Sequence, residues 1–190
     1  MYTNNSGNSS EGEVEVKRLF IGAGCNRIVN NVSWGACDLV SFGAQNAVAI
    51  FCPKTAQILI TLPGHKASVN CTHWIPSNKF AFRGECKLSC VETLFVGSKP
   101  MVSLSLAELP GNSGYIVLAM GGLDSKVHLY CGERTGKFIH ACELKAHTDW
   151  IRSLDFSLPI FMDGEANSIL LVSSSQDKGI RIWKMALRVP

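Results

Sequence analysis

The chain has 190 residues, of which 46% are hydrophobic and 17% charged, and this favours one globular domain with a buried core. The net charge of +3 comes from 18 basic and 15 acidic residues spread along the chain, which argues against a dominant nucleic-acid role. No apolar run is long enough to span a membrane, and the first residues contain no apolar signal segment. We therefore expect no membrane span, eight reduced cysteines, and a cytoplasmic location with the nucleus left open.

Short β-strands are predicted along almost the whole chain. Residues 1–13, rich in Asn, Ser and Gly, are expected to form a disordered tail. After them, apolar residues recur with period two or in short runs bounded by Gly, Pro, Asn and Asp, which is typical of strands. Only residues 101–109 could also be argued as a helix. The expected strands cover residues 27–34, 39–43, 47–51, 57–62, 68–74, 101–106, 115–121, 126–130, 151–156, 168–174 and 179–183.

Internal repeats decide among the all-β folds. His65 and His147 are each followed four residues later by a β-branched residue and nine residues later by an aromatic one. Segments 124–130 and 177–183 share Asp at the start, a β-branched residue at plus three, an aliphatic at plus five and an aromatic at plus six. Segment 45–51 repeats this with Gln in place of Asp. Such repetition predicts an all-β WD-repeat β-propeller, here an incomplete arc of about three to four blades.

A buried polar network is predicted inside the blades, except that the first blade, with Phe51 at the aromatic position, is expected to close by packing alone. In the last blade it would join His147, Asp177, Trp183 and one of the serines 173–175, with Ser173 as the candidate. Such a network stabilises a blade only if every member has a hydrogen-bond partner, since a buried unpaired group is costly. His65, Asp124 and Tyr130 are expected to play the same structural role in the earlier blades, in partial networks.

No catalytic or cofactor site is expected. Cys86 and Cys90 could form half of a metal site, but no second pair occurs at ligand spacing. Gly22 and Gly24 lack the third glycine of a dinucleotide loop, and no phosphate-binding loop or nucleophile elbow occurs. The sequence therefore predicts no metal, no cofactor, no small-molecule substrate and no enzymatic activity.

Three segments carry a family resemblance: KRLFIGAGCNRIVNNVSWGA, SFGAQNAVAIFCPKTAQILITLPGHKASVNCTHW, and HTDWIRSLDFSLP with LLVSSSQDKGIRIWK. They resemble the WD-repeat subunit family of the Elongator complex in its plant form, over roughly residues 14–83 and 90–187. The resemblance implies a non-catalytic scaffold with two seven-bladed propellers, in a complex that modifies wobble uridines of tRNA. Its implied partners are the large scaffold subunit and the catalytic subunit, with tRNA contacted only indirectly.

The chain departs from this family pattern in its domain organisation. The first blades are expected over residues 14–83 and later blades of the same propeller over residues 101–190. The junction between them, residues 84–100, has neither the Asp nor the Trp that would complete the blade begun at His65. His65 and His147 are 82 residues apart, about two repeat periods, with one complete Asp-to-aromatic pattern between them. We therefore expect an internal deletion at the junction and a shortened chain.

A protein-binding surface is predicted on the loops that precede the inner strands, because loops on a rigid frame collect recognition residues. Trp and Arg are enriched at binding hot spots, although Trp150 could instead pack between blades. A generic WD-repeat adaptor and an RNA-contacting propeller, the latter using Lys17, Arg18, Arg27, Lys54 and Lys66, are the alternatives. The candidate protein-binding residues are Lys66, Ser68, Asp149, Trp150 and Arg152.

Overall fold

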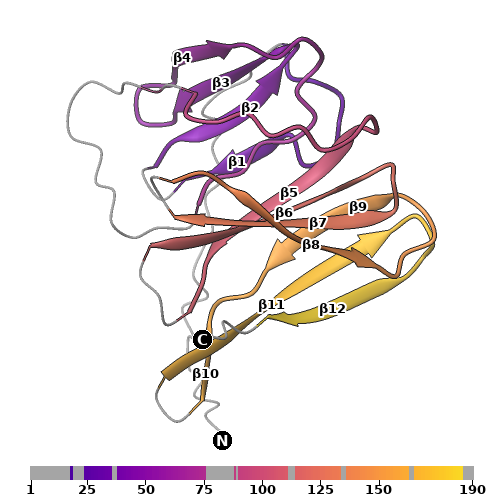
Figure 1. Ribbon diagram of the computed structural model, residues 1–190. Coiled ribbons are helices and arrows are strands. Elements are labelled where there is room, and N and C mark those ends of the chain that lie inside the picture. The colour runs from indigo at the N-terminus through magenta and orange to yellow at the C-terminus, as the bar shows by residue number, and fades with distance from the viewer. Residues whose placement is uncertain are drawn as a thin grey trace, which may run out of the picture.

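The computed structural model describes residues 18, 24–35, 38–75, 88, 90–110, 114–133, 136–162 and 165–185, and these residues form only strands and loops (Figure 1). The strands make three four-stranded antiparallel sheets. The predicted all-β fold and incomplete propeller arc are therefore confirmed, with three blades in the described ranges. The expected tail, residues 1–13, lies outside those ranges. No helix in them is long and apolar enough to cross a membrane.

The first sheet is a meander in the order β1-β2-β3-β4. A two-residue turn, Gln45-Asn46, joins β2 to β3, and Gln45 adopts a φ of 53° there. Such left-handed conformations match the twist of hairpin strands. The strands are β1 (Val32–Trp34), β2 (Val40–Ala44), β3 (Ala47–Cys52) and β4 (Gln57–Pro63).

The second sheet is also a meander, in the order β5-β6-β7-β8. The segment that could have been a helix is the strand β5. The outer strand β8 was not predicted, because its polar residues His140, Glu143 and Lys145 interrupt the apolar pattern of a strand that is largely exposed on both faces. The strands are β5 (Met101–Glu108), β6 (Tyr115–Gly122), β7 (Lys126–Glu133) and β8 (Ile139–Lys145).

The third sheet is organised around β11, which pairs with β9, β10 and β12. A turn at residues 176–179 joins β11 to β12, with Lys178 at a φ of 66°. The three-residue strand β10 was not predicted. The strands are β9 (Ile151–Phe156), β10 (Ile160–Met162), β11 (Glu165–Ser175) and β12 (Ile180–Met185).

The strand predicted over residues 68–74 is wrong: this segment lies outside all three sheets. It connects the first two sheets instead. The Val69 amide donates to the Gln45 carbonyl at 2.8 Å, and the Asn70 side chain donates to the Met101 carbonyl at 2.9 Å. A strand needs a neighbouring strand, and described residues 90–100 of the predicted junction form none that could pair with it.

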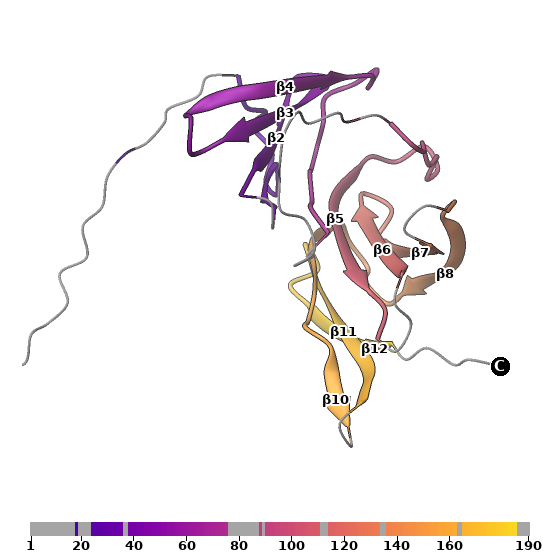
Figure 2. The same cartoon turned by 90° about the vertical axis from the view of Figure 1, so that its left-hand side faces the viewer.

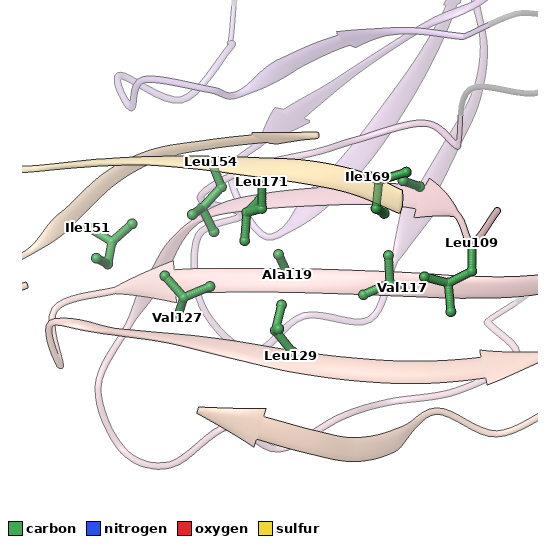
Figure 3. Packing of buried hydrophobic residues seen from close by; sticks show 10 residues of the cluster. Leu109, Val117, Ala119, Val127, Leu129, Ile151, Leu154, Ile169 and Leu171 are labelled. Atoms are coloured by element: carbon green, nitrogen blue, oxygen red, sulfur yellow. The ribbon is translucent and has the colours of Figure 1, made fainter. Parts of the chain in front are cut away.

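The hydrophobic core lies between the second and third sheets, where β9 packs against β5 and β6 (Figures 1 and 2). Its side chains come from both sheets and interdigitate in Figure 3. Gly121 permits close approach of β9, because a Cβ there would lie 2.6 Å from Ile151. The Ser103 hydroxyl accepts a hydrogen bond from the Leu154 amide at 3.0 Å across the sheets. The cluster contains Ala107, Leu109, Val117, Ala119, Val127, Leu129, Ile151, Leu154, Ile169 and Leu171.

The other face of the third sheet carries uncovered apolar side chains. Val172 and Ile182 are opposite one another in the strand register, so they share this face. The exposed fractions are 38% for Val172, 68% for Ile182 and 72% for Ile180. Within the described ranges β12 pairs only with β11, so it offers an apolar surface and a free strand edge, a combination that promotes association between chains.

We expect the double substitution Ile180→Ser and Ile182→Ser to reduce self-association of the 190-residue chain. Light scattering coupled to size-exclusion chromatography at several concentrations should show a larger monomer fraction than for the unchanged chain. The matched control is Ile139→Ser, because Ile139 is equally exposed at 72% but lies on β8. If the unchanged chain, the double variant and the Ile139→Ser control associate equally, this face does not mediate self-association.

Candidate functional site

A four-residue polar network ties the third sheet together, and it contains the residues proposed for the last blade. The His147 Nδ1 atom lies 2.9 Å from Asp177 Oδ2, and its Nε2 atom lies 2.9 Å from the Ser173 hydroxyl. The Trp183 indole donates to the same hydroxyl at 3.0 Å. Ser173 is fully buried, and the side chain of His147 is only 1% exposed. The structure therefore brings together Ser173 of β11 and Trp183 of β12. It adds His147 from the loop before β9 and Asp177 from the turn between β11 and β12.

The donors and acceptors of this network define a single arrangement of protons. A carboxylate can only accept, so His147 carries its proton on Nδ1 and donates it to Asp177. Its Nε2 atom then accepts from the Ser173 hydroxyl, which itself accepts from Trp183. Arg181 lies 3.1 Å from the same Nδ1, but both are donors, so we assign its favourable interaction to the Asp177 carboxylate at 3.7 Å.

Asp177 also holds two backbone segments. Its Oδ2 atom accepts from the Thr148 amide at 3.0 Å, and its Oδ1 atom accepts from the Gly179 amide at 2.7 Å. Burial alone would raise the pKa of this carboxyl, but the hydrogen bonds from Thr148, His147 and Gly179 together hold its pKa well below its usual range. One ionised side chain thus links the loop before β9 to the turn between β11 and β12.

Two further hydrogen bonds fix the loop that carries the predicted binding residues. The Ser175 hydroxyl donates to the Asp149 carbonyl at 2.9 Å, and the Gln176 amide donates to the Trp150 carbonyl at 2.9 Å. The Asp149 carboxylate accepts from the Trp150 amide at 2.7 Å. The carbonyls of Asp149 and Trp150 are therefore tied to the end of β11 and its turn, while the Trp150 side chain is 44% exposed. Preorganised, accessible aromatic residues of this kind are suited to binding.

The second sheet has a different polar pair from the one expected. Asp124 lies 2.5 Å from His128 Nε2, and His128 is a residue of β7 rather than of a preceding loop. Tyr130 meets the ring of His140 edge-on, with centroids 5.2 Å apart. Sequence reasoning missed His128 because the repeat pattern places aliphatic or charged residues at that strand position. Asp124 and Tyr130 are therefore near one another on this sheet but in separate pairs.

Among the residues that the structure describes, no polar network forms around His65 in the first sheet, and the polar links there differ from the predicted closure by packing alone. This residue is exposed, and its carbonyl accepts from the Asn46 side chain at 3.2 Å. Two asparagines supply the polar links instead. Asn31 is 4% exposed and exchanges two hydrogen bonds with the Gly43 backbone, at 2.9 and 3.0 Å. Asn26 links the Gln45 and Val69 carbonyls at 2.8 and 3.0 Å. The repeat pattern contained no signal for these asparagines.

The remaining predicted binding residues form two groups. Lys66 and Ser68 are exposed on the loop after β4, whereas Arg152 is exposed at the start of β9 beside Trp150. Among the described residues, no hydrogen bond or ion pair joins the two groups directly. The loop before β1 contacts the group around Trp150, because the Asn30 side chain donates to the Arg152 carbonyl at 2.9 Å. We therefore treat Asp149, Trp150 and Arg152 as the candidate binding surface.

The five cations considered for RNA contact differ in their surroundings. Lys54 forms an ion pair with Asp38 at 2.7 Å, which compensates its charge. Arg18, Arg27 and Lys66 are exposed, and Lys17 lies outside the described residues. This arrangement adds no observation in favour of the RNA-contacting alternative.

Comparisons with known proteins identify relatives. A family model described as "WD domain, G-beta repeat" matches residues 56–131 and 136–184. Elongator complex protein 2 of Arabidopsis thaliana is 49% identical over 260 residues, covering 94% of this chain and 31% of the relative. The proteins of that name from Dictyostelium discoideum and Saccharomyces cerevisiae are 27% and 24% identical, covering 88% and 89% of this chain.

These matches confirm the resemblance inferred from the sequence motifs. They also show its extent, because the chain spans about a third of the length of the curated relatives it matches. The alignment with the Arabidopsis protein runs over 260 residues, more than the 190 of this chain, so the relative has residues without a counterpart here. The deletion expected at residues 84–100 stays a prediction.

Proposed function

This chain belongs to the WD domain, G-beta repeat family, and we propose that it is a non-catalytic scaffold of the Elongator complex. The observation that carries the proposal is the match of nearly the whole chain to Elongator complex protein 2 from several organisms. The geometry supports a binding role, because the polar network of the third sheet holds the loop before β9 in place, and this loop carries the exposed Trp150. His147, Ser173 and Asp177 each have structural partners.

The finer proposal is that the chain contributes to modification of wobble uridines in tRNA through protein–protein binding. Its partners would be the large scaffold subunit and the catalytic subunit of the complex, and tRNA would be contacted only indirectly. We further propose a cytoplasmic location, with the nucleus as the open alternative. Recovery of the native protein from fractionated cells, with its associated proteins identified by mass, tests both points. Absence of every Elongator subunit from that set would contradict the scaffold role.

The binding surface that we propose is formed by Asp149, Trp150 and Arg152. Trp and Arg carry much of the binding energy at protein interfaces when their backbones are already ordered. Trp150 meets this condition, because hydrogen bonds from Ser175 to the Asp149 carbonyl and from Gln176 to the Trp150 carbonyl hold the loop. Its exposed side chain can therefore be covered by a partner without a large loss of backbone entropy.

We expect Trp150→Ala to weaken binding of the chain to the other purified Elongator subunits by at least about tenfold. Biolayer interferometry with the subunits immobilised measures this change. Trp34→Ala is the matched control, because Trp34 is 66% exposed on β1 and lies outside the proposed surface. Loss of binding with Trp34→Ala but not with Trp150→Ala would move the surface to the first sheet. Absence of binding by the unchanged chain would contradict the scaffold proposal itself.

A further inference from the structure

Three potential metal ligands meet on the outer part of the second sheet. The ligand atoms of His128, His140 and Glu143 all lie within 4.8 Å of one another. His128 belongs to β7, and the other two residues belong to the neighbouring strand β8. His128 and Glu143 are register partners, so their side chains share one face of the sheet. Two imidazoles and one carboxylate are a ligand set typical of zinc sites that keep one position open.

A β-bulge explains how His140 joins this face. Glu143 and His140 are three residues apart, and in a regular strand they would point to opposite faces. The register shifts between Leu129 and Tyr130, so that Leu129 pairs with Cys142 and Tyr130 with His140. The extra residue in β8 reverses the alternation and puts His140 beside Tyr130, on the face of Glu143. The edge-on contact with the Tyr130 ring at 5.2 Å orients the His140 imidazole.

His128 is oriented as a metal-binding histidine would be. The Asp124 carboxylate lies 2.5 Å from its Nε2 atom, so this nitrogen carries the proton. In the neutral ring the Nδ1 lone pair is then available to a metal, and this atom lies 3.7 Å from Glu143 Oε1. A carboxylate that accepts the second N–H of a ligand histidine recurs around protein zinc ions. His128 is also 7% exposed, so its ring is held in place by packing.

Among the described residues, one oxygen of Glu143 has no hydrogen-bond partner and is available to a metal. Its Oε2 atom is 2.8 Å from the Lys126 ammonium and 3.4 Å from that of Lys145. Its Oε1 atom is too far from His128 Nδ1 for a direct hydrogen bond. Bond lengths of about 2.0–2.2 Å at a tetrahedral zinc ion place two ligand atoms about 3.4 Å apart, close to the observed separation. A cavity of about 350 Å³, bordered by residues 95–99 and these side chains, leaves space for a fourth ligand.

We propose that His128, His140 and Glu143 form a zinc-binding site, with Asp124 as the positioning residue for His128. The ion would bind His128 Nδ1, Glu143 Oε1 and one ring nitrogen of His140, and water would complete the coordination. It would connect the exposed outer strand β8 to the buried strand β7 and so stabilise the second sheet. Neighbouring Lys126 and Lys145 oppose the cation, and we expect Lys126→Gln to tighten binding.

Equilibrium dialysis of the untagged 190-residue chain against Zn²⁺ tests the site. We expect one bound ion per chain, and a rise in melting temperature when zinc is added, because only the folded chain holds the three ligands together. His140→Ala and Glu143→Gln should each weaken zinc binding by at least about tenfold, and Asp124→Ala by about 10–100-fold. His65→Ala is the matched control, because His65 is an exposed histidine on another sheet and should leave binding unchanged.

Cobalt absorption distinguishes this site from binding by cysteine. Six cysteines in the described residues are free, and Cys131 and Cys142 lie on the same two strands. Co²⁺ bound to nitrogen and oxygen gives visible bands without thiolate charge-transfer bands in the near ultraviolet, and this is the expected result. Strong thiolate bands would overturn the proposal. Unchanged zinc binding in both His140→Ala and Glu143→Gln, which alter side chains that are not fully buried, would overturn it as well.

Discussion

Substitution of Leu171 by Ala should reduce the free energy of unfolding by about 2–5 kcal/mol, the range for removing a large side chain from a packed core. Leu171 is fully buried on β11, in the cluster that joins the second and third sheets (Figure 3). The cavity left by the substitution would open between the second and third sheets, which contact one another through this cluster. Chemical denaturation followed by tryptophan fluorescence measures the loss.

The neighbouring residue provides the control for this prediction. Val172 is on the same strand but points to the opposite, half-exposed face, at 38% exposure. Val172→Ala should therefore cost less than about 1 kcal/mol. Similar losses for the two substitutions would show that the interface between the sheets is not packed as described.

Substitution of Asp177 by Asn should lower the melting temperature by about 3–10 °C at neutral pH. Both carboxylate oxygens accept hydrogen bonds, from Thr148 and His147 on one side and from Gly179 on the other. Asn keeps one acceptor and replaces the other with a donor, so at least one N–H group would face another donor. The negative charge opposite Arg181 would be lost too. Differential scanning calorimetry checks the size of the change.

The same substitution should matter less in acid. The pKa of Asp177 lies well below its usual range in the folded chain, whereas an unfolded Asp has a pKa of about 3.9. The ionised carboxylate therefore contributes its full stability above the unfolded pKa, and this contribution is lost as pH falls toward the folded pKa. The difference in melting temperature between the unchanged chain and Asp177→Asn should be largest near pH 7 and smaller near pH 3.

Asp155→Asn is the control for both Asp177 measurements, because Asp155 is an exposed residue of β9 in the same sheet. It should change the melting temperature by no more than about 2 °C. If Asp177→Asn behaves like Asp155→Asn at neutral pH, the network does not stabilise the blade.

The proposed zinc site and the polar network of the third sheet both place a histidine beside a carboxylate, but the second nitrogen of the histidine differs between them. In the network, both nitrogens of His147 have partners, and the set is closed. On the second sheet, His128 has a hydrogen-bond partner for one nitrogen, and the Glu143 carboxylate oxygen is 3.7 Å from the other nitrogen, beyond hydrogen-bond distance. In the network neither nitrogen of His147 is left for a ligand, whereas the proposed zinc site would use the Nδ1 atom of His128.

The sequence by itself was enough for the all-β fold and for most of the strands. Regular alternation of apolar residues and the repeated Asp-to-aromatic pattern are local signals, and β7 and β12 follow them closely. The residues proposed for the last network, His147, Ser173, Asp177 and Trp183, also lie at repeat positions, and the structure places them within hydrogen-bonding distance. Repetition made these positions visible, although only the third sheet forms the complete network.

Only the tertiary structure showed the features that depend on contacts between strands. Residues 68–74 have the pattern of a strand, yet they form none, because strand formation requires a partner that local sequence does not reveal. The outer strand β8 lacks the pattern but pairs with β7 through its backbone. The bulge that puts His140 and Glu143 on one face is likewise a property of the pairing. Local periodicity therefore predicted strands, whereas register and backbone hydrogen bonding determined which side chains meet.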